Sequence, residues 1–480
     1  MAKTYRTERD ALGDVQVPTE ALWGAQTQRS LDNFRIGQDR IPEPVIRALL
    51  EIKRAAAQVN HALLPERMTE EKRAAITGVC DKILSDYPSY AEMFPLSVFQ
   101  TGSGTQTNMN VNEVICRAVN LGAGKALCHP NDDINMSQSS NDVFPAAMHI
   151  AAAMELEHGV LPALTKLEVA LEDLIPGNEN RIKCGRTHLQ DATPVRFSQE
   201  IFGWLGMLST DYQNIDLAHC GLFKLALGGT AVGTGLNCPE GFDRAIAKEL
   251  ANRTGLPFRT HPNKFQALTG RTELAFAHGA LKALAADLMK IANDIRFLAS
   301  GPRAGYGELK IPENEPGSSI MPGKVNPTQC EAVCMVAVQV MADDLAVNMA
   351  ASQGNFELNV YAPVLISNFL RSTTLLTDAM RSFTEHCVKG IEAIPSRMQA
   401  DMERSLMLVT ALSPEIGYAK AAEIAHLAYA ENLTLKAACL KLGYLDEARF
   451  DELVKPERMA GKTVEEILQD NRTMEIEEDE

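Results

Sequence analysis

Apolar residues recur every three or four positions over long stretches of this chain. The clearest series is Leu281, Leu284, Leu288, Ile291, Ile295 and Leu298. Two further series are Leu164, Leu167, Leu171, Leu174 and Phe197, Ile201, Leu205, Leu208, Tyr212, Ile215. This period places the apolar side chains on one face of a helix, close to the heptad of a packed bundle. Residues 330–350 are apolar on nearly all sides, which indicates a helix buried in the centre of a bundle or an oligomer. We therefore predict a mainly α fold.

Changes in pattern divide the chain into three predicted domains. Residues 1–141 mix short elements with turns, include a helix after Pro44, and indicate a mixed, mostly helical N-terminal domain. Long amphipathic helices occupy residues 142–395, and residues 396–480 indicate a small helical domain with an acidic tail. We expect the final MEIEEDE to lack regular structure. The glycine-rich segment Gly228–Gly235 lacks the strand–helix–strand context of a nucleotide-binding loop, so we expect a tight turn there.

Composition and charge exclude several classes of protein. The chain has 480 residues, 45% of them hydrophobic, which suffices for a large core. A net charge of −16 without a basic block argues against nucleic-acid binding, although local groups can still bind a small anion. Ten cysteines without a CxxC pair predict reduced thiols, no metal site and a cytoplasmic protein. We expect no secretory signal and no membrane insertion, because no sufficiently long apolar run occurs.

Four polar segments interrupt the apolar pattern. They are TGSGTQTNMN from Thr101, HPNDDINMSQSSNDVFP from His129, GRTHLQDATP from Gly185 and GSSIMPGKVNP from Gly317. The first could bind carboxylate oxygens or simply cap the helix that follows it. In the second, Asn141 and Asp142 could be helix caps, although the segment carries more polar groups than capping needs. His188 of the third segment, which we expect to be a short polar connection, fits a structural role as well as a catalytic one.

The fourth segment, Gly317–Pro327, combines backbone breakers with reactive side chains. Its two glycines and two prolines exclude a regular helix or strand. It carries the hydroxyls of Ser318 and Ser319, the cation of Lys324 and the carboxamide of Asn326. Such a loop could close as a lid over a small anionic substrate, or it could be an ordinary connection with a solvated lysine.

Together, the four segments resemble those of the aspartase/fumarase superfamily, and most closely those of the class II, metal-independent fumarate hydratases. The likeness extends from about residue 5 to about residue 460, and GSSIMPGKVNPTQCE is its most specific part. The resemblance implies a three-domain chain whose long central bundle forms a twenty-helix core in a homotetramer. It also implies reversible hydration of fumarate to L-malate, a reaction of the tricarboxylic acid cycle, without a metal or other cofactor.

The resemblance implies roles for individual residues. Ser318 would be the base that removes the C3 proton of malate, and His188, oriented by Glu331, would handle the proton of the hydroxyl group or water. Lys324 would stabilise the doubly charged aci-carboxylate intermediate, since a unit charge pair at ~4 Å is worth roughly 4 kcal/mol at an effective dielectric constant of about 20. Which of Ser318 and His188 takes the carbon-bound proton stays open. The other implied substrate-binding residues are Ser103, Gly104, Thr105, Ser139, Ser140, Asn141, Thr187, Ser319, Val325 and Asn326.

One departure from the family concerns a second dicarboxylate site. The resemblance implies that this site consists of His129, Pro130, Asn131 and Asp132. Relatives often carry an arginine three residues before the histidine, where this chain has Ala126 with Lys125 beside it. Binding at the second site therefore stays open.

Two alternatives to a fumarate hydratase follow from the same resemblance. Aspartate ammonia-lyase and other fumarate-releasing lyases share the fold, but aspartases usually have glutamine at the position of His188. A hydroxyl leaving group needs acid catalysis, whereas ammonium leaves already protonated, so His188 favours the hydratase. An inactive structural protein on this scaffold would be expected to lose Ser318, His188 or Lys324, and all three are present.

The predicted helix lengths indicate active sites shared between chains. Residues 143–174 predict one helix of about 30 residues, which at ~1.5 Å per residue spans on the order of 45 Å. Asn141 precedes this helix and His188 follows it. Because two groups so far apart cannot both contact a four-carbon acid, we expect Asn141 and His188 of different protomers to form one site.

Overall fold

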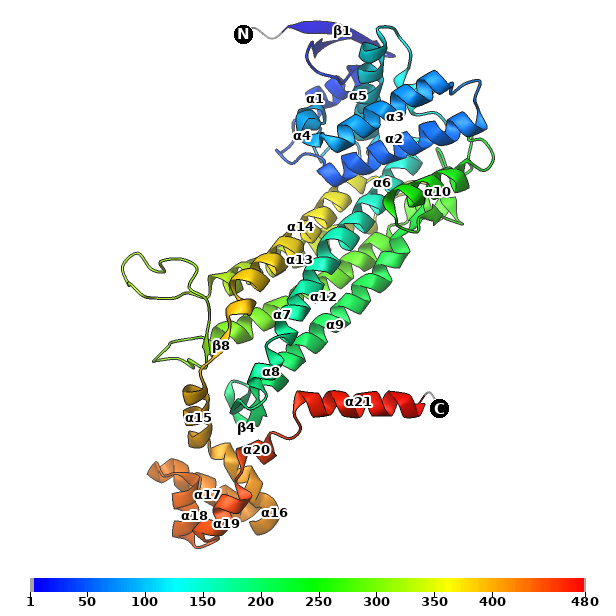
Figure 1. Cartoon of the computed structure of the whole chain (residues 1–480). Coiled ribbons are helices and arrows are strands. Elements are labelled where there is room, and N and C mark those ends of the chain that lie inside the picture. Colours follow the sequence, from blue (N-terminus) through cyan, green and yellow to red (C-terminus); the bar gives the residue numbers. More distant parts are fainter. Residues whose placement is uncertain (1–3, 479–480) are drawn as a thin grey trace. The chain divides into compact units, whose positions relative to one another are not determined.

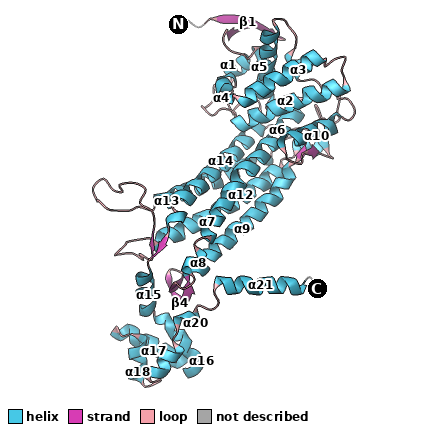
Figure 2. Cartoon of the chain, viewed as in Figure 1, coloured by secondary structure: helices cyan, strands magenta, loops and turns pink. Residues whose placement is uncertain are grey.

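The computed structural model of this protein describes residues 4–478. Helices account for most of the chain, and the strands are short and paired in twos (Figures 1 and 2). The prediction of a mainly α fold is therefore confirmed. Among residues 4–478, no helix has the length and apolar character that crossing a membrane requires.

The chain divides into two compact units. The first comprises the chain up to Pro162 together with Gln213–Ala285 and Val338–Thr377. The second comprises Ala163–Tyr212, Ala286–Ala337 and the chain from Asp378 onward. The long helices α9, α12, α13 and α14 each contribute residues to both units, because the unit boundaries fall within them. The three-domain division stays a prediction.

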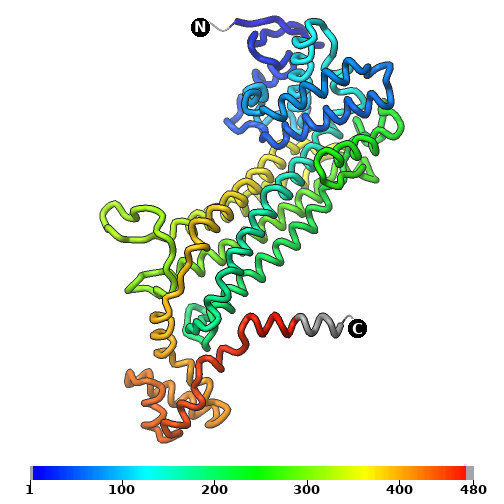
Figure 3. Tube along the Cα trace, in the orientation of Figure 1, coloured from blue at the N-terminus to red at the C-terminus, as the bar shows by residue number. Residues whose placement is uncertain are grey.

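The first unit begins with a hairpin and a group of helices. Their bounds are β1 Tyr5–Asp10, β2 Gly13–Pro18, α1 Ala25–Asn33, α2 Glu43–Leu63, α3 Glu70–Ser85, α4 Tyr87–Tyr90 and α5 Thr105–Ala123. Strands β1 and β2 pair in antiparallel register, and α2 and α3 lie side by side (Figure 3). Helix α2 begins beside Pro44, as predicted, since proline fits the first turn of a helix. Its Leu49, Leu50 and Ile52 are completely buried.

The first unit also contains α6 and several shorter elements. They are α6 Ser140–Glu155, the π-helical turn Leu156–Val160, β5 Lys224–Leu225, α10 Phe242–Thr254, β6 Arg259–Thr260 and α11 Lys264–Thr269. The long helices are α9 Phe197–Leu222, α12 Thr272–Leu298, α13 Thr328–Ala351 and α14 Ala362–His386. The predicted apolar seam of α12, from Leu281 to Leu298, is confirmed, because all its members are at most 5% exposed.

The predicted helix over residues 143–174 is formed by consecutive helical elements. Helix α6 leads through the π-helical turn into α7, Leu161–Glu172. Pro162 is the second residue of α7, just after the π-helical turn, and the wider hydrogen-bonding pattern of such a turn accommodates a residue without an N–H group. The proline therefore does not end the helical course.

The second unit contains short helices, one β-hairpin and one antiparallel pair of short strands that are far apart in the sequence. Its other elements are α8 Ile175–Asn178, β3 Ile182–Thr187, β4 Gln190–Arg196, β7 Leu309–Lys310, β8 Glu392–Ala393, α15 Pro395–Arg404, the 3-10 helix Leu406–Leu412, α16 Ser413–Ile416, α17 Tyr418–Glu431, α18 Leu435–Leu442, α19 Glu447–Leu453, α20 Pro456–Met459 and α21 Val464–Glu478. Leu412, Ile424, Ala438 and Cys439 form the centre of its C-terminal apolar cluster.

The acidic C-terminal segment differs from its prediction. Helix α21 extends to Glu478, so the prediction that MEIEEDE lacks regular structure is wrong for residues 474–478. Glutamate and methionine favour helices, and α21 continues without a proline or glycine to stop it. Residues 479 and 480 lie outside the described residues.

Four histidines of the first unit are removed from water. His149, His219, His261 and His278 are each at most 9% exposed, and burial lowers the pKa of all four. Burial lowers the pKa of His149 to about 4, and its Nδ1 lies 3.2 Å from the carbonyl oxygen of Leu222. The folded chain therefore keeps these imidazoles neutral at a pH at which the unfolded chain protonates them.

Acid should destabilise the protein through His149. Its folded pKa lies below the unfolded value of ~6.5, so its contribution is complete above pH ~6.5 and is lost as the pH falls through about 4. The full shift corresponds to about 3 kcal/mol of unfolding free energy. In urea titrations at constant protein concentration, His149→Gln should flatten the loss of stability between pH 7 and pH 5, because a neutral amide can still donate to Leu222.

The matched control is His158→Gln, which changes an exposed histidine of the same helical course. It should leave the pH dependence of unfolding unchanged. An unaltered pH dependence in His149→Gln would contradict the assignment.

Candidate active site

The predicted carboxylate-binding residues of the first unit gather where two long helices begin. Helix α5 starts after Gly104, whose φ is 74°, and α6 starts after its N-cap residue Ser139. A Cβ atom on Gly104 would lie 2.3 Å from the ring of Phe144, so glycine permits this close approach of the two helices. Asn108 Nδ2 donates to Ser140 Oγ at 3.0 Å and links them further. Helix N-termini offer free N–H groups and a positive dipole end, which suits a carboxylate.

Asp142 fixes the start of α6 to a glycine-rich turn. The backbone N–H of Ser139 donates to Asp142 Oδ1 at 2.9 Å, which completes a capping box. Asp142 Oδ2 accepts the backbone N–H groups of Gly228 and Thr230 at 3.0 and 2.9 Å. Burial raises the pKa of Asp142 to about 6. The tight turn predicted for Gly228–Gly235 is confirmed, and its contact with Asp142 is a link that sequence reasoning missed.

The polar side chains of this region are oriented by hydrogen bonds. Asn141 Nδ2 donates to the carbonyl oxygen of Ala231 at 2.8 Å, and the hydroxyls of Ser103 and Thr105 lie 2.9 Å apart. The structure thus brings one group of predicted residues together in the first unit. This group consists of Ser103, Gly104, Thr105, Ser139, Ser140 and Asn141.

A buried lysine supports the segment that leads into α6. Lys53 of α2 is 1% exposed, and its Nζ donates to Asn135 Oδ1 at 3.0 Å and to Gln138 Oε1 at 2.9 Å. Burial lowers the pKa of Lys53 to about 7, since its direct partners are neutral amides. Sequence reasoning missed this residue because a lysine in an amphipathic helix normally lies in water.

His188 lies at the tip of a β-hairpin in the second unit. Strands β3 and β4 pair with Thr187 opposite Gln190, which leaves His188 and Leu189 as a two-residue turn. Both have left-handed φ values, 56° and 60°, as in a type I′ turn. Side chains other than glycine cost roughly 1–2 kcal/mol each in this region, and such strain is frequent at functional sites. The side chain of His188 is exposed in the single chain.

The hairpin corrects the expectation of a polar connection without strands. The usual sequence signal for a two-residue hairpin is Asn-Gly or Asp-Gly, and His188 and Leu189 do not carry it. Burial does not alternate in β3, where Lys183, Cys184 and Gly185 are all buried, and the alternation around Pro194 in β4 is too short to stand out beside the long helical patterns.

Ser318 lies in a loop that directs backbone amides at its hydroxyl. Its Oγ accepts the N–H groups of Ile320 and Met321 at 3.3 and 3.2 Å. Gly317 has a φ of 78°, and a Cβ atom there would lie 1.9 Å from the carbonyl oxygen of Lys324, so this loop requires glycine. The Lys324 side chain is exposed and forms no ion pair with the side chains described in residues 4–471.

The other predicted residues of the second unit lie along this loop or just after it. They are Ser319, Val325 and Asn326 in the loop, Glu331 in the first turn of α13, and Thr187 at the end of β3. Within the described part of the chain, no hydrogen bond joins His188 to Glu331. The orientation of His188 by Glu331 therefore stays a prediction.

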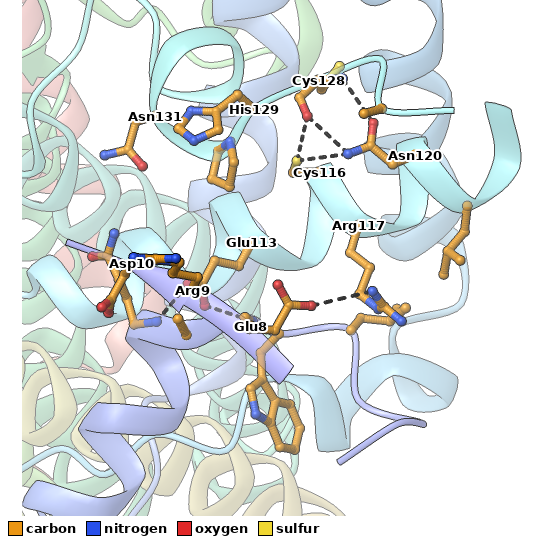
Figure 4. Close-up of a pocket in the computed structure, with 18 of the residues that line it drawn as sticks. Glu8, Arg9, Asp10, Glu113, Cys116, Arg117, Asn120, Cys128, His129 and Asn131 are labelled. Atoms are coloured by element: carbon orange, nitrogen blue, oxygen red, sulfur yellow. Dashed lines mark hydrogen bonds and ion pairs between the residues drawn. The ribbon is translucent and has the colours of Figure 1, made fainter. Parts of the chain in front are cut away.

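The predicted second dicarboxylate site borders a cavity of about 820 Å³ in the first unit. Figure 4 shows His129 and Asn131 next to each other at its wall, with Arg117 also facing the cavity. Arg117 Nη1 lies 3.5 Å from Glu8 Oε1, and Lys125 pairs with Glu71 at 2.6 Å. Further lining residues are Arg6, Arg9, Ala126 and Pro130, whereas Asp132 does not line the cavity. None of the residues predicted to be catalytic borders this cavity.

The cysteines are free thiols. All ten lack a disulfide partner, and burial raises the pKa of several of them, Cys116 to about 12 and Cys128 to about 11. Among the side chains described in residues 4–471, no group of three or more His, Cys, Asp or Glu is arranged to hold a metal ion.

Comparison with known families identifies the class of protein. A family model described as "Lyase" matches residues 13–342, and one described as "Fumarase C C-terminus" matches residues 408–461. The first match spans more than half of the chain, so the fold is that of a lyase.

Individual relatives narrow this class. The chain is 54% identical to "Fumarate hydratase class II" of Listeria monocytogenes over 95% of its own length and 99% of the relative's. It is 55% identical to "Fumarate hydratase class II 1" of Pseudomonas aeruginosa, with 95% and 98% covered. The chain belongs to the class II fumarate hydratase family.

Solved structures agree with this assignment. A class II fumarase from Schistosoma mansoni superposes with a TM-score of 0.93 at 41% identity, covering 95% of this chain and 99% of that one. A fumarate lyase:delta crystallin from Brucella melitensis, bound to cobalt, gives a TM-score of 0.90 at 39% identity, covering 96% and 100%.

Proposed function

We propose that this chain catalyses the reversible addition of water to fumarate, which yields L-malate. The observation that carries the proposal is the Ser318 hydroxyl, which accepts two backbone N–H groups in a glycine-bounded loop that also carries Lys324. Dehydration of malate requires removal of a proton from the carbon next to a carboxylate. That step places additional negative charge on the carboxylate, so the enzyme must stabilise a doubly charged aci-carboxylate.

Ser318 is the proposed base. A free serine is far too weak an acid to exist as an alkoxide near neutral pH, so its surroundings must stabilise the anion. The N–H groups of Ile320 and Met321 are directed at Oγ and supply part of this stabilisation. Lys324 supplies a full positive charge in the same loop and stabilises the aci-carboxylate more strongly than the ground state.

His188 is the proposed acid and base for the hydroxyl group. An imidazole can donate a proton to the departing hydroxyl and take one from the attacking water. A hydroxyl requires this help, whereas ammonium does not, so His188 favours malate over aspartate as the substrate. Thr187 and Asn326 add neutral donors that orient the substrate. The residues at the starts of α5 and α6 bind a carboxylate of the same dicarboxylic acid.

A homotetramer with shared active sites is the proposed assembly. Helix α13 exposes Met335, Val338, Leu345 and Met349, each at least 60% exposed and spaced by three, seven and four residues. An exposed apolar stripe at heptad-like spacing on a long helix is typical of a helix that packs against other chains. Further copies of this chain would cover it in a twenty-helix core, and different protomers would supply Asn141 and His188 to one site.

The cavity next to His129 is the proposed second dicarboxylate site. His129 and Asn131 offer polar groups at its wall, and Arg6, Arg9, Arg117 and Lys125 supply positive charge. Relatives often carry an arginine where this chain has Ala126, so one positive charge is missing here. We expect Arg117 to supply the positive charge that binds the dicarboxylate instead. The proposed compartment is the cytoplasm, which is supported by ten free thiols.

The central test offers the protein its candidate substrates after treatment with a chelator. With L-malate, fumarate should form and its ultraviolet absorbance should rise, whereas L-aspartate should give no signal. We expect chelation to leave the rate unchanged. Formation of fumarate from aspartate alone would assign the chain to the ammonia-lyases. Loss of activity that iron or zinc restores would contradict the proposed metal-independent mechanism.

Replacing the proposed groups should lower kcat more than it raises KM. Ser318→Ala, Lys324→Ala and His188→Asn should each lower kcat by about 10³-fold, because each group acts mainly in the transition state. Steady-state kinetics with malate would measure this. Lys389→Ala, which removes an exposed lysine paired with Glu385, is the control and should behave as wild type. Near-wild-type turnover in Ser318→Ala would exclude that residue as the base.

Complementation should reveal shared sites. Asn141→Ala and His188→Asn proteins should each have very low activity, but unfolding them together and refolding should produce mixed tetramers in which some sites carry neither substitution. Activity should then rise well above that of either parent refolded alone, and mass spectrometry of the intact assembly would confirm mixing. Mixed tetramers that remain as inactive as the parents would place each site within one chain.

A further inference from the structure

The base of the His188 hairpin contains a buried group of charges. Lys183 Nζ lies 3.0 Å from Glu200 Oε2 and 3.1 Å from Glu308 Oε2, and the side chains of Lys183 and Glu308 are 2% and 0% exposed. These two contacts have the geometry of ion pairs. The directional hydrogen bond to Glu308 comes from Arg186, whose Nη2 donates to Oε1 at 2.7 Å. Two basic residues of β3 thus meet one buried carboxylate.

Glu308 is itself held firmly in the second unit. Its backbone N–H donates to the carbonyl oxygen of Leu298 at 2.9 Å, and its own carbonyl accepts the N–H of Ile394 at 2.8 Å. Next to it, Tyr306 stacks on Arg186, with the guanidinium carbon 4.3 Å from the ring centroid. Arg397 Nε donates to the carbonyl oxygen of Tyr306 at 2.8 Å. The carboxylate is therefore a fixed point to which the hairpin is attached.

The attachment lies close to the proposed catalytic residue. Arg186 precedes His188 by two residues, and the turn formed by His188 and Leu189 has left-handed φ values that side chains other than glycine rarely adopt. A strained turn persists when the surrounding structure determines the course of both strands. Burial opposes the positive charge of Arg186, but the hydrogen bond and the charge of Glu308 hold its pKa above the ordinary value. Arg186 therefore keeps its positive charge next to the buried carboxylate of Glu308.

We propose that Glu308 is a positioning residue that, through Arg186 and Lys183, holds the β3–β4 hairpin so that His188 reaches the substrate hydroxyl. The inference rests on the role of His188 in the proposed function. Buried ion pairs contribute little net stability compared with apolar packing, but removing one partner is costly, which makes them suited to fixing geometry. An error of about 1 Å in the position of a reacting group can lower a rate by about 10²-fold.

A purely structural role for Glu308 predicts a different result from a role exerted through His188. A structural defect would lower activity whether or not His188 is present. The activity would then fall in proportion to the loss of folded tetramer. A positioning defect would lower kcat without a comparable change in KM, and it would have no further effect once His188 is gone. A double-mutant cycle between the two residues separates these cases.

The test compares wild type, Glu308→Gln, His188→Asn and the double variant in malate dehydration. Glu308→Gln should lower kcat by about 10- to 100-fold with KM within about threefold of wild type. In the His188→Asn background the same change should lower the residual rate by no more than about twofold. Glu392→Gln, which removes the carboxylate of an exposed pair with Lys310, is the matched control and should leave kcat unchanged.

Two outcomes would overturn the inference: an unchanged kcat in Glu308→Gln, or an equal loss with and without His188. If Glu308→Gln fails to fold, Arg186→Gln combined with Glu308→Gln replaces it, because this pair of changes leaves Lys183 and Glu200 balanced in charge. The combined variant should show the same fall in kcat and the same dependence on His188. Two different results would show that the proposed function itself fails. The wild-type protein would form no fumarate from malate, or the His188→Asn protein would be fully active.

Discussion

The apolar seams of the long helices determine where chemistry can occur in this chain. The side chains from Leu281 to Leu298 are buried along one face of α12, and such a seam has no place for an unpaired polar group. His278, which is buried in the helical core, is paired through both ring nitrogens, with Asp344 Oδ1 at 3.1 Å and Ser372 Oγ at 2.9 Å. Reactive side chains are therefore restricted to the starts of helices and the connections between them. Ser139, His188 and Ser318 all occupy such positions.

A connection between helices is mobile unless contacts hold it in place. In this chain, buried charged side chains hold the connections that carry the predicted site residues. Asp142 joins the start of α6 to the turn at Gly228, and Lys53 holds the preceding segment through Asn135 and Gln138. Glu308 does the same for the hairpin that carries His188. Each of these charges is costly to bury, so stability alone does not explain them. Their common feature is that each immobilises a segment with predicted site residues.

The sequence predicts the features that depend on local pattern. The seam of α12, the helical course from residue 140 to 172 and the turn at Gly228 were all readable from periodicity and glycine positions. The hairpin at His188 could not be predicted from the sequence, since its turn lacks the usual Asn-Gly or Asp-Gly pair and its strands are short. The buried positions of Lys53 and Glu308 could not be predicted either. A charged residue in a helix or loop normally lies in water, and only the fold shows which distant residues enclose it.

The site residues themselves were predicted from their resemblance to a family and not from geometry. Physical reasoning on the residues left His188 as a structural or catalytic histidine and Ser318 as part of a lid or a plain connection. The structure adds a reason to prefer a catalytic His188 and a functional Ser318 loop: a strained turn at His188 and two N–H groups directed at Ser318 Oγ. Neither feature can be read from a sequence, because both depend on backbone angles in segments that have no periodicity.

The proposed chemistry also links catalysis to assembly. In the single chain Lys324 and His188 are exposed to water. At ~4 Å, a charge pair is worth about 1 kcal/mol in water but about 4 kcal/mol at an effective dielectric constant of about 20. Lys324 can therefore stabilise an aci-carboxylate adequately only if water is excluded from its surroundings. The exposed apolar stripe from Met335 to Met349 favours association of chains, because removing apolar surface from water lowers the free energy. Association that covers this stripe and encloses the polar loops would supply the low-dielectric environment that one chain lacks. A folded but dissociated chain, which cannot bring Asn141 and His188 to one substrate, should therefore not turn malate over.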